Sequence, residues 1–271
     1  MADGFTLEKF SQNPFYEEVN RRLVALARPQ PGQRVVDLGA GTGAVTRLLV
    51  AEVANKPTAE VIAVEPSESA IEAARRNLEN ISGAVVGFVQ GSAERLSQLV
   101  RRPVDAVFFC NAIHLVQEKA AVVQEVYRSL REDGTFSFNT AFFQGAEPPE
   151  SFQFYRRWMM KALRFLREQY DLGPDKAKRA LARQPLSAEQ YGALLEANGF
   201  YVREKQVVPV AMTLKGFEDI SEYSLFIEGV MPGVPLERGS EALKHGARAA
   251  FEELRLETSP RNWLLVVASK N

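Results

Sequence analysis

The sequence predicts an α/β fold, a doubly wound parallel sheet interrupted by a helical insertion. Between residues 34 and 143, short apolar runs alternate with stretches of helical periodicity, which is typical of consecutive βαβ units. After Phe143 this alternation stops, and the next thirty or so residues have a helical pattern without an intervening strand. A length of 271 residues suits one such domain with an insertion, or one domain with a small partner.

The apolar runs predict five strands of a single sheet, because the right-handed crossover rule leaves few other arrangements. These strands span residues 34–38, 60–65, 84–89, 104–110 and 135–142. Periodicity predicts helices over residues 44–54, 67–80, 93–100 and 118–130. After the insertion, the pattern of the sheet resumes with a helix over 187–197 and strands over 201–212 and 262–269.

These elements divide the chain into three expected parts. Residues 1–143 would hold the N-terminal helices and the ligand-binding core. Residues 144–186 would form the helical cap insertion, which starts in a stretch rich in Gly, Pro and Glu. Residues 187–271 would close the core, with a second lid segment near 213–258.

Composition excludes several classes of protein. The 33 Lys and Arg residues nearly balance the 34 Asp and Glu residues, so no basic excess is present to bind nucleic acid. Cys110 is the only cysteine and the two histidines lie far apart, so we expect no disulfide and no metal site. No stretch approaches the roughly 18 apolar residues of a membrane span, and the charged first thirty residues are unlike a secretory signal. A cytoplasmic location is therefore expected.

The junction between the first strand and the first helix carries the most informative motif. Residues 35–43 read Val-Val-Asp-Leu-Gly-Ala-Gly-Thr-Gly. Alternate glycines let the backbone turn sharply and let a ligand approach without a Cβ in the way. Two acidic residues accompany the loop, since Asp37 precedes it and Glu65 ends the second strand roughly 20 residues further on. The motif therefore predicts a ligand-binding loop rather than a merely tight turn.

The same motif indicates which ligand is bound. Its spacing is G-x-G-x-G rather than the G-x-G-x-x-G of dinucleotide-binding loops. A carboxylate at Asp37 would repel a pyrophosphate but would favour a cation. Glu65 is placed to accept hydrogen bonds from both hydroxyls of a ribose. A positively charged nucleoside without phosphates fits these observations together.

In these motifs the sequence resembles the class I S-adenosylmethionine-dependent methyltransferases. The likeness is carried by residues 36–43, by Val-Glu-Pro-Ser at 64–67, by Gln-Gly-Ser-Ala-Glu at 90–94 and by Cys-Asn-Ala-Ile-His at 110–114. It covers about residues 15–143 and the closing strands. The resemblance implies a Rossmann-like sheet of seven strands whose last strand, 262–269, is antiparallel. It also implies S-adenosylmethionine as cofactor, S-adenosylhomocysteine as product and no metal.

The resemblance further implies the cofactor contacts. The residues expected to bind the cofactor are Asp37, Gly39, Ala40, Gly41, Thr42, Gly43, Glu65, Pro66, Ser92, Ala93, Glu94 and Asn111. Asp37 and the glycine loop would hold the methionyl part, Glu65 the ribose, and residues 92–94 the adenine. Many relatives have an acidic residue where Ser92 stands, so either Ser92 or Glu94 would accept from the adenine amino group. The alternative for these two residues is an ordinary helix cap with a charge in the first turn.

His114 is the candidate general base. Methyl transfer from a sulfonium needs alignment and exclusion of water, and a base only where the acceptor carries an acidic proton. His114 follows the fourth strand at the carboxyl edge of the sheet, where ligands of open α/β folds bind. The alternative is that His114 only packs beneath the acceptor pocket, because a single histidine without a visible partner carries little information.

The insertion could form a lid over an apolar acceptor. Its apolar residues recur at helical spacing at positions 152, 155, 159, 163 and 166, which in most proteins marks a core face. Insertions at the carboxyl edge, however, are where this kind of fold builds pockets. The residues expected to contact the acceptor are Tyr16, His114, Phe142, Tyr155, Arg156, Met159 and Tyr223.

Residues 151–185 are also strongly basic, with nine Lys and Arg against three acidic residues. The basic residues are Arg156, Arg157, Lys161, Arg164, Arg167, Lys176, Lys178, Arg179 and Arg183. Such a run commonly forms a solvated face. Alternatively, some of these side chains bind an anionic group of the acceptor, such as a carboxylate, a diphosphate or the phosphopantetheine of a carrier protein.

The sequence thus predicts a methyltransferase that acts on a small, apolar or amphiphilic and potentially anionic metabolite. The layout is similar to quinone-biosynthesis and natural-product methyltransferases, with a carrier-bound substrate as one option. Neither nucleic acid nor a membrane span is expected. Two other readings remain open: a non-catalytic module that binds S-adenosylmethionine or S-adenosylhomocysteine, and an NAD(P)-dependent oxidoreductase, which the glycine spacing and Asp37 disfavour.

Overall fold

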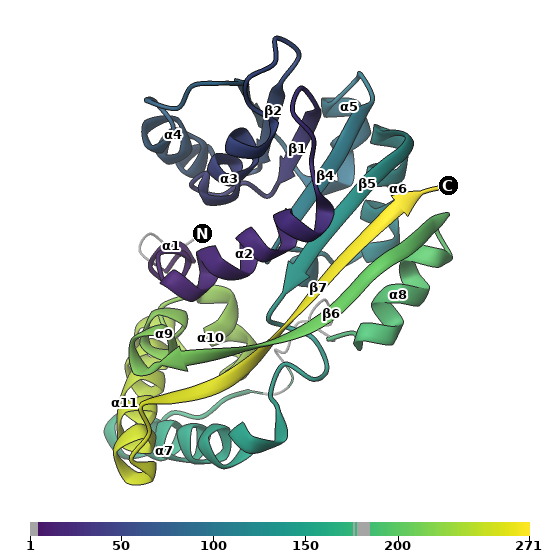
Figure 1. Ribbon diagram of the computed structural model, residues 1–271. Coiled ribbons are helices and arrows are strands. Elements are labelled where there is room, and N and C mark those ends of the chain that lie inside the picture. The colour runs from purple at the N-terminus through teal and green to yellow at the C-terminus, as the bar shows by residue number, and fades with distance from the viewer. Residues whose placement is uncertain (1–4, 176, 178–184) are drawn as a thin grey trace. The chain divides into compact units, whose positions relative to one another are not determined.

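The chain forms two compact units. The computed structural model describes residues 5–175, 177 and 185–271 (Figure 1). Residues 17–144, 185–208 and 263–271 make up the first, which we call the sheet unit. Residues 1–16, 145–184 and 209–262 belong to the second, the helical unit. In the described part of the chain, no helix is long and apolar enough to cross a membrane.

One seven-stranded sheet organises the fold. Its strands are β1 (Arg34–Leu38), β2 (Glu60–Glu65), β3 (Val85–Gln90), β4 (Val104–Cys110), β5 (Leu130–Thr140), β6 (Phe200–Thr213) and β7 (Thr258–Lys270). The strand order is β3-β2-β1-β4-β5-β7-β6. Strands β1 to β5 pair in parallel, whereas β7 pairs antiparallel to β5, with Thr135 opposite Ser269. The predicted α/β class, the single sheet and the antiparallel last strand are therefore confirmed.

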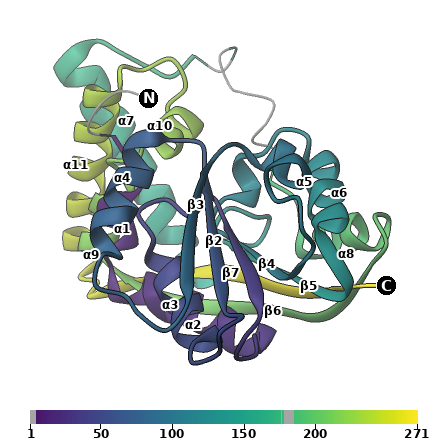
Figure 2. The same ribbon diagram turned by 90° about the horizontal axis from the view of Figure 1, so that it is seen from above.

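Helices cover both faces of this sheet. In Figure 2, α3 (Ala44–Val53) and α4 (Glu68–Asn77) lie on one face, and α5 (Leu96–Leu99), α6 (Lys119–Ser129) and α8 (Ala188–Glu196) lie on the other. The remaining elements of the unit are α2 (Pro14–Ala27), which begins in the helical unit, and the short 3₁₀ turns η1 (Ala93–Arg95) and η2 (Ile113–Leu115). Helix α4 starts where predicted, because the Ser67 hydroxyl caps it by accepting from the Ala70 N–H.

The sequence misplaced the start of β5. A helix to residue 130 followed by a strand from 135 was predicted, but α6 ends at Ser129 and β5 begins at Leu130. Leu130 already pairs with Val104, and the ladder then shifts register before Thr135 pairs with Ala106. Asp133 takes a left-handed conformation, with φ of 60°, inside this irregular stretch. Residues 132–134 therefore belong to a distorted strand and not to a connection between a helix and a strand.

The helical unit is built around two long helices. Its elements are α1 (Glu8–Ser11), η3 (Pro149–Ser151), α7 (Phe152–Tyr170), α9 (Leu214–Ile220), α10 (Ser224–Val230) and α11 (Leu236–Leu254). Helices α7 and α11 cross closely at Gly246, where an added Cβ would lie only 2.6 Å from the Trp158 carbonyl oxygen. Glycine is thus required by the approach of the two backbones. Trp158 and Phe217 are fully buried in the aromatic core of this unit.

Helix α7 buries only part of the predicted stripe, since Tyr155 and Leu166 are buried as their spacing predicts and two other members are not. The predicted stripe held Phe152 and Leu163, whose side chains are 55% and 38% exposed. The observed buried face consists of Phe154, Tyr155, Trp158, Ala162 and Leu166. Its phase follows from the crossing with α11, where Ala162 as well as Trp158 packs beside Gly246. The exposed apolar residues of α7 therefore remain on its outer surface.

Candidate cofactor site and acceptor cavity

The glycine loop has left-handed backbone at all three glycines. The φ angles of Gly39, Gly41 and Gly43 are 69°, 54° and 90°. At Gly43 an added Cβ would lie 2.9 Å from the Leu78 side chain, so this glycine lets α4 pack against the loop. At Gly41 an added Cβ would meet no atom within 4 Å. The loop thus leaves open space where a ligand can approach the backbone.

The N–H groups of this loop are directed into the protein. The Gly39 and Ala40 N–H groups donate to the Val64 carbonyl at 2.8 and 3.1 Å, and the Gly43 N–H donates to the Ala40 carbonyl at 2.9 Å. The Gly41 N–H donates to Glu65 Oε2 at 3.0 Å. Phosphate-binding loops present several such N–H groups to their ligand. Here four of the five from Gly39 to Gly43 already have protein acceptors, so the loop is unsuited to a pyrophosphate.

Asp37 lies beneath the loop in a buried, hydrogen-bonded position. Its side chain is 1% exposed, and Thr46 Oγ1, in the first turn of α3, donates to its Oδ2 at 2.6 Å. Burial raises the pKa of this carboxyl, the hydrogen bonds from Thr46 oppose that rise, and the nearby charge of Glu65 adds to it, so that the pKa is about 7. A cationic ligand near Asp37 would favour its ionised form.

Glu65, at the carboxyl end of β2, is held by the backbone on both sides. Its Oε2 accepts from Gly41 and its Oε1 accepts from the Ser67 N–H, each at 3.0 Å. A carboxylate has about four acceptor positions, so each oxygen keeps capacity for another donor. Two backbone contacts therefore orient a carboxylate that can still accept from the two hydroxyls of a ribose.

The residues predicted for adenine follow β3. Ser92 precedes η1, yet its hydroxyl makes no cap hydrogen bond to that turn. Glu94 is exposed in the first turn, and Ala93 is half-buried beside it. Pro66 is exposed at the end of β2. Ser92 therefore does not cap this turn with its side chain, which was the alternative role expected for it.

The loop after β4 holds Asn111 and His114. Asn111 is 4% exposed and has left-handed backbone with φ of 50°. Its neighbour Ala112 touches the glycine loop, since a Cβ added to Gly39 would lie 3.3 Å from the Ala112 Cβ. The end of β4 therefore lies beside the end of β1, as expected for adjacent parallel strands.

His114 has a partner that the sequence did not reveal. Its Nδ1 lies 3.0 Å from Thr140 Oγ1, at the end of β5. The same oxygen accepts from the Phe142 N–H at 3.0 Å, and the Phe142 ring lies against the imidazole with centroids 4.3 Å apart. The predicted residues His114 and Phe142 are thus brought together, with Thr140 fixing the orientation of the ring.

A largely apolar cavity of about 340 Å³ lies within the helical unit. It is lined by Glu147, Phe152, Tyr155, Arg156, Trp158, Met159, Phe226 and Val230. Three residues predicted to contact the acceptor, Tyr155, Arg156 and Met159, therefore meet in one cavity. Tyr155 is held in place by Arg261, whose Nη1 donates to its hydroxyl at 3.0 Å.

The other predicted acceptor residues lie elsewhere. Tyr16 is 7% exposed and packs edge-on against Phe10, in the helical unit. Tyr223 is also 7% exposed and precedes α10. Neither residue is among those that line the 340 Å³ cavity.

Much of the predicted basic face is neutralised. Arg157 and Lys161 pair with Glu253 of α11 at 3.2 and 2.6 Å, and the hydrogen bond from Lys161 lowers the pKa of Glu253. Arg164 pairs with Glu168 at 2.7 Å. In the described part of the chain, Arg156 has no ion-pair partner. Lys176, Lys178, Arg179 and Arg183 lie outside the described residues.

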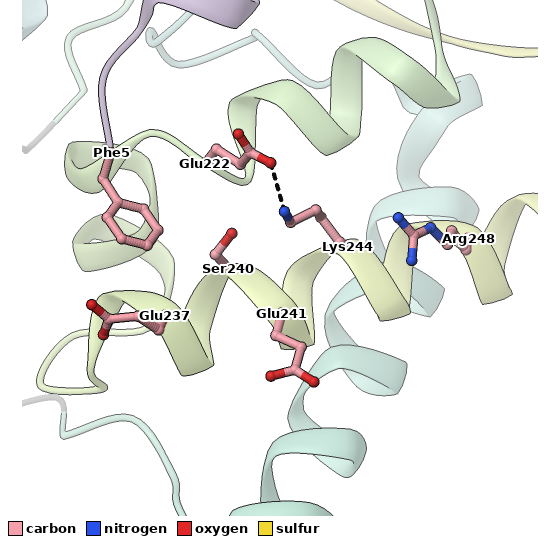
Figure 3. Close-up of a pocket in the computed structure, with 7 residues that line it drawn as sticks. All are labelled: Phe5, Glu222, Glu237, Ser240, Glu241, Lys244 and Arg248. Carbon is pink, nitrogen blue, oxygen red and sulfur yellow. Dashed lines mark hydrogen bonds and ion pairs between the residues drawn. The ribbon is translucent and has the colours of Figure 1, made fainter. Parts of the chain in front are cut away.

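A second cavity of the helical unit, of about 370 Å³, is polar (Figure 3). Glu222 accepts from Lys244 at 2.6 Å and also from Lys9 of α1. Arg248 pairs with Glu218. The sequence did not single out these residues, and their pairing joins α1 and α11 to the segment between α9 and α10. Among the described residues, no group of three or more His, Cys, Asp or Glu is placed to hold a metal ion.

Known proteins with similar sequences include methyltransferases, the class that the glycine loop and its acidic residues predict. Residues 35–134 match the sequence family described as "Methyltransferase domain". That stretch of the chain is thus similar to a methyltransferase domain. The resemblance to class I S-adenosylmethionine-dependent methyltransferases that the motifs predicted is thereby confirmed.

Two curated relatives match part of this chain. A malonyl-[acyl-carrier protein] O-methyltransferase of Methylococcus capsulatus is 35% identical over 125 residues, which are 45% of this chain and 43% of that protein. A ubiquinone/menaquinone biosynthesis C-methyltransferase of Xanthomonas campestris is 34% identical over 116 residues, 42% of this chain and 44% of that protein. The chain thus spans less than half the length of each of these relatives.

A solved structure shows the same fold over most of the chain. A mycolic acid cyclopropane synthase, crystallised with S-adenosylhomocysteine and CTAB, has a TM-score of 0.56 at 16% identity. The match covers 94% of this chain and 84% of that one. At such low identity the likeness concerns the fold alone.

Three residues of the site were missed by the sequence reasoning. Thr46 donates to Asp37, Thr140 lies against His114, and Trp263 donates from β7 to Asn111. Thr46 gave the only local signal, as a hydroxyl residue in the first turn after the glycine loop. Thr140 and Trp263 come from other strands, and no spacing in the sequence links them to their partners.

Proposed function

We propose that this protein transfers a methyl group from S-adenosylmethionine to a small apolar or amphiphilic acceptor. The observation that supports this most is the glycine loop, whose N–H groups turn inward while two carboxylates, Asp37 and Glu65, accompany it. Such a site favours a cationic nucleoside with a free ribose over a phosphorylated dinucleotide. The cofactor would supply an electrophilic methyl group on a positively charged sulfur, which leaves as a neutral thioether.

The residues of the chain fit the remaining tasks. Glu65 would accept from the ribose hydroxyls, and Asp37 would offer negative charge near the sulfonium end of the cofactor. His114 would take the proton of an acidic acceptor. Thr140 Oγ1 accepts from Phe142 and has a second lone pair for the His114 Nδ1–H, and in that tautomer Nε2 carries the lone pair that a base needs.

One cavity of the helical unit supports the proposed acceptor class. The 340 Å³ cavity is lined mainly by aromatic and aliphatic side chains, which suits the apolar part of a metabolite. Arg156 lines the same cavity and has no ion-pair partner among the described residues, so it would bind an anionic group of the acceptor. Phenolic quinone precursors and carrier-bound acyl groups are the two acceptor types that combine these properties.

Calorimetry with the purified chain tests the cofactor assignment. We expect binding of S-adenosylmethionine and S-adenosylhomocysteine and none of NAD; binding of NAD alone would overturn the proposal. Incubation with S-adenosylmethionine and panels of the two acceptor types should then release S-adenosylhomocysteine. Tight binding of the cofactor with no turnover on any metabolite extract would instead support a sensor or a structural module.

A further inference from the structure

The outer face of α7 gathers exposed apolar side chains. Three of the seven large hydrophobic residues that are exposed in the described part of the chain lie on this helix. Phe152, Met160 and Leu163 are 55%, 48% and 38% exposed, and at about 100° per residue they fall within about 80° of one another around the helix. The other four are spread over β3, η2 and β6. An apolar face of this kind on a water-exposed helix marks a contact surface.

Two of the five basic residues of α7 face the neighbouring helix. Arg157 and Lys161 both pair with Glu253 of α11, at 3.2 and 2.6 Å, so their charge is neutralised within the helical unit. The same helical projection places the other three basic residues beside the exposed apolar ones. These three exposed side chains are Arg156, Arg164 and Arg167.

These three arginines give the outer face a positive charge. Glu168 is the only acidic residue of α7, and it pairs with Arg164 at 2.7 Å. Both partners are more than half exposed, so water screens this pair and it holds Arg164 only weakly. Arg156 and Arg167 have no ion-pair partner among the described residues. The face therefore complements a surface that carries negative charge above an apolar interior.

The acceptor cavity reaches the surface at this face. Phe152 and Arg156 line the 340 Å³ cavity and are themselves exposed, so the cavity opens beside the apolar and basic side chains. The acceptor proposed above is apolar or amphiphilic, and such a molecule partitions into a lipid layer. From a lipid layer against α7, it would enter the cavity without first dissolving in water.

The mixing of the two kinds of side chain favours a lipid surface over a protein partner. Protein interfaces commonly have an apolar centre and a charged rim. On α7, by contrast, two arginines project between two apolar residues. In order around the helix these four are Leu163, Arg156, Arg167 and Met160. A lipid surface satisfies this arrangement, because guanidinium groups bind its phosphates while the apolar neighbours insert among the acyl chains.

We propose that the protein binds reversibly to an anionic lipid surface through the outer face of α7, and that the acceptor cavity opens toward the lipid. Lipid binding goes beyond the proposed function, whereas uptake of the acceptor from the lipid rests on it. Glu147 also lines the cavity, and its negative charge would weaken the attraction to lipid phosphates. Glu147→Gln should therefore strengthen lipid binding.

Flotation of the whole chain with lipid vesicles tests this proposal. We expect binding to vesicles of equal parts phosphatidylcholine and phosphatidylglycerol, none to phosphatidylcholine alone, and release as the salt concentration rises. Arg167→Gln should lower the partition coefficient about fivefold, the contribution of one cationic side chain at such a surface. Leu163→Gln should lower it about tenfold, because an inserted apolar side chain is lost. Neither residue lines the cavity, so calorimetry should find the affinity of both variants for S-adenosylhomocysteine unchanged.

Arg157→Gln and Val85→Gln are the matched controls. Arg157 lies on the same helix but pairs with Glu253, and Val85 is 63% exposed on β3, in the sheet unit. Both variants should float with the mixed vesicles as wild type does. Each variant of this series should also keep the wild-type melting temperature, because none of the replaced side chains is buried.

Absence of binding to the mixed vesicles, equal binding to both kinds of vesicle, or equal losses in the test and control variants would overturn the inference. Binding of an acidic acyl-carrier protein that Arg167→Gln weakens, with no binding to vesicles, would assign the face to that partner instead. Unchanged binding of Glu147→Gln would overturn the placement of the cavity toward the lipid. In all these cases, binding of S-adenosylhomocysteine by the wild type leaves the proposed function standing. Vesicle binding without cofactor binding would overturn the proposed function and retain the lipid surface.

Discussion

The sheet unit and the helical unit position their functional side chains in different ways. In the sheet unit, Glu65 is oriented by N–H groups of its own and the neighbouring strand end, at Ser67 and Gly41. In the helical unit, Tyr155 is oriented by Arg261, more than a hundred residues further along the chain. Glu65 is thus held by short backbone loops that a sequence motif predicts. Tyr155, like His114 at the end of β4, is held by a residue distant in the sequence, which no motif predicts.

Among the variants considered, replacement of His114 should have the largest effect on turnover. It tests whether this residue, which a motif predicts, acts as the general base. His114→Ala should lower kcat about a hundredfold or more on an acceptor with an acidic proton, since general bases contribute at least that much. The affinity for S-adenosylhomocysteine should remain unchanged. His245→Ala is the control, because His245 is exposed and stacks only on Phe165 among the described rings. Normal turnover of His114→Ala would remove the base assignment.

Glu65→Ala should act on the cofactor alone. The substitution removes the acceptor of two backbone N–H groups and of the ribose hydroxyls, so calorimetry should show about a hundredfold weaker binding of S-adenosylhomocysteine. Glu60→Ala lies at the other end of the same strand, where Glu60 pairs with Arg34, and should leave this affinity unchanged. Similar losses in both variants would show that β2 as a whole, not the carboxylate of Glu65, determines binding.

Asp37 should make cofactor affinity depend on pH. Because burial raises its pKa to about 7, the free protein holds a proton there at lower pH, and binding of a cation must release it. S-adenosylmethionine should therefore bind about tenfold more weakly at pH 6 than at pH 8. Asp37→Asn should abolish this dependence, as measured by calorimetry in two buffers of different ionisation enthalpy. A pH dependence that persists in Asp37→Asn would have another origin.

The same group predicts how stability varies with pH. The folded-state pKa lies above the unfolded value of 3.8, so the folded protein binds the proton more tightly. Its contribution to stability is therefore greatest at low pH, falls as the pH rises from about 4 to about 7, and is constant above that. Thermal melting should find Asp37→Asn more stable than wild type at pH 8.

Arg156 and Arg157 provide the smallest and most discriminating test. Arg156→Gln should raise the KM of an anionic acceptor about three- to tenfold, because the side chain lines the cavity without an ion-pair partner among the described residues. Arg157→Gln should not, since Arg157 is paired with Glu253. Equal KM values in the two variants and in wild type would mean that the basic face plays no part in acceptor binding.

The extent of what could be predicted follows from how far apart the interacting residues lie in the sequence. Local patterns in the sequence predict the strand positions, the loop after β1 and the two acidic residues, Asp37 and Glu65. The order of these motifs along the chain predicts the resemblance to methyltransferases. The stripe predicted for α7 was wrong at Phe152 and Leu163, because the close approach of α11 at Gly246 determines which residues of α7 are buried. Thr140 and Trp263 were missed because strand pairing brings them to His114 and Asn111 from distant parts of the chain.

The inward-facing N–H groups of the glycine loop have a thermodynamic consequence. A loop whose backbone is already hydrogen-bonded in the free protein loses little conformational entropy when a ligand arrives. The nucleoside should then bind to a preformed site, with a modest change in heat capacity. The association rate should be limited by diffusion and not by ordering of the loop. Slow, strongly temperature-dependent association kinetics would show that this part of the backbone rearranges instead.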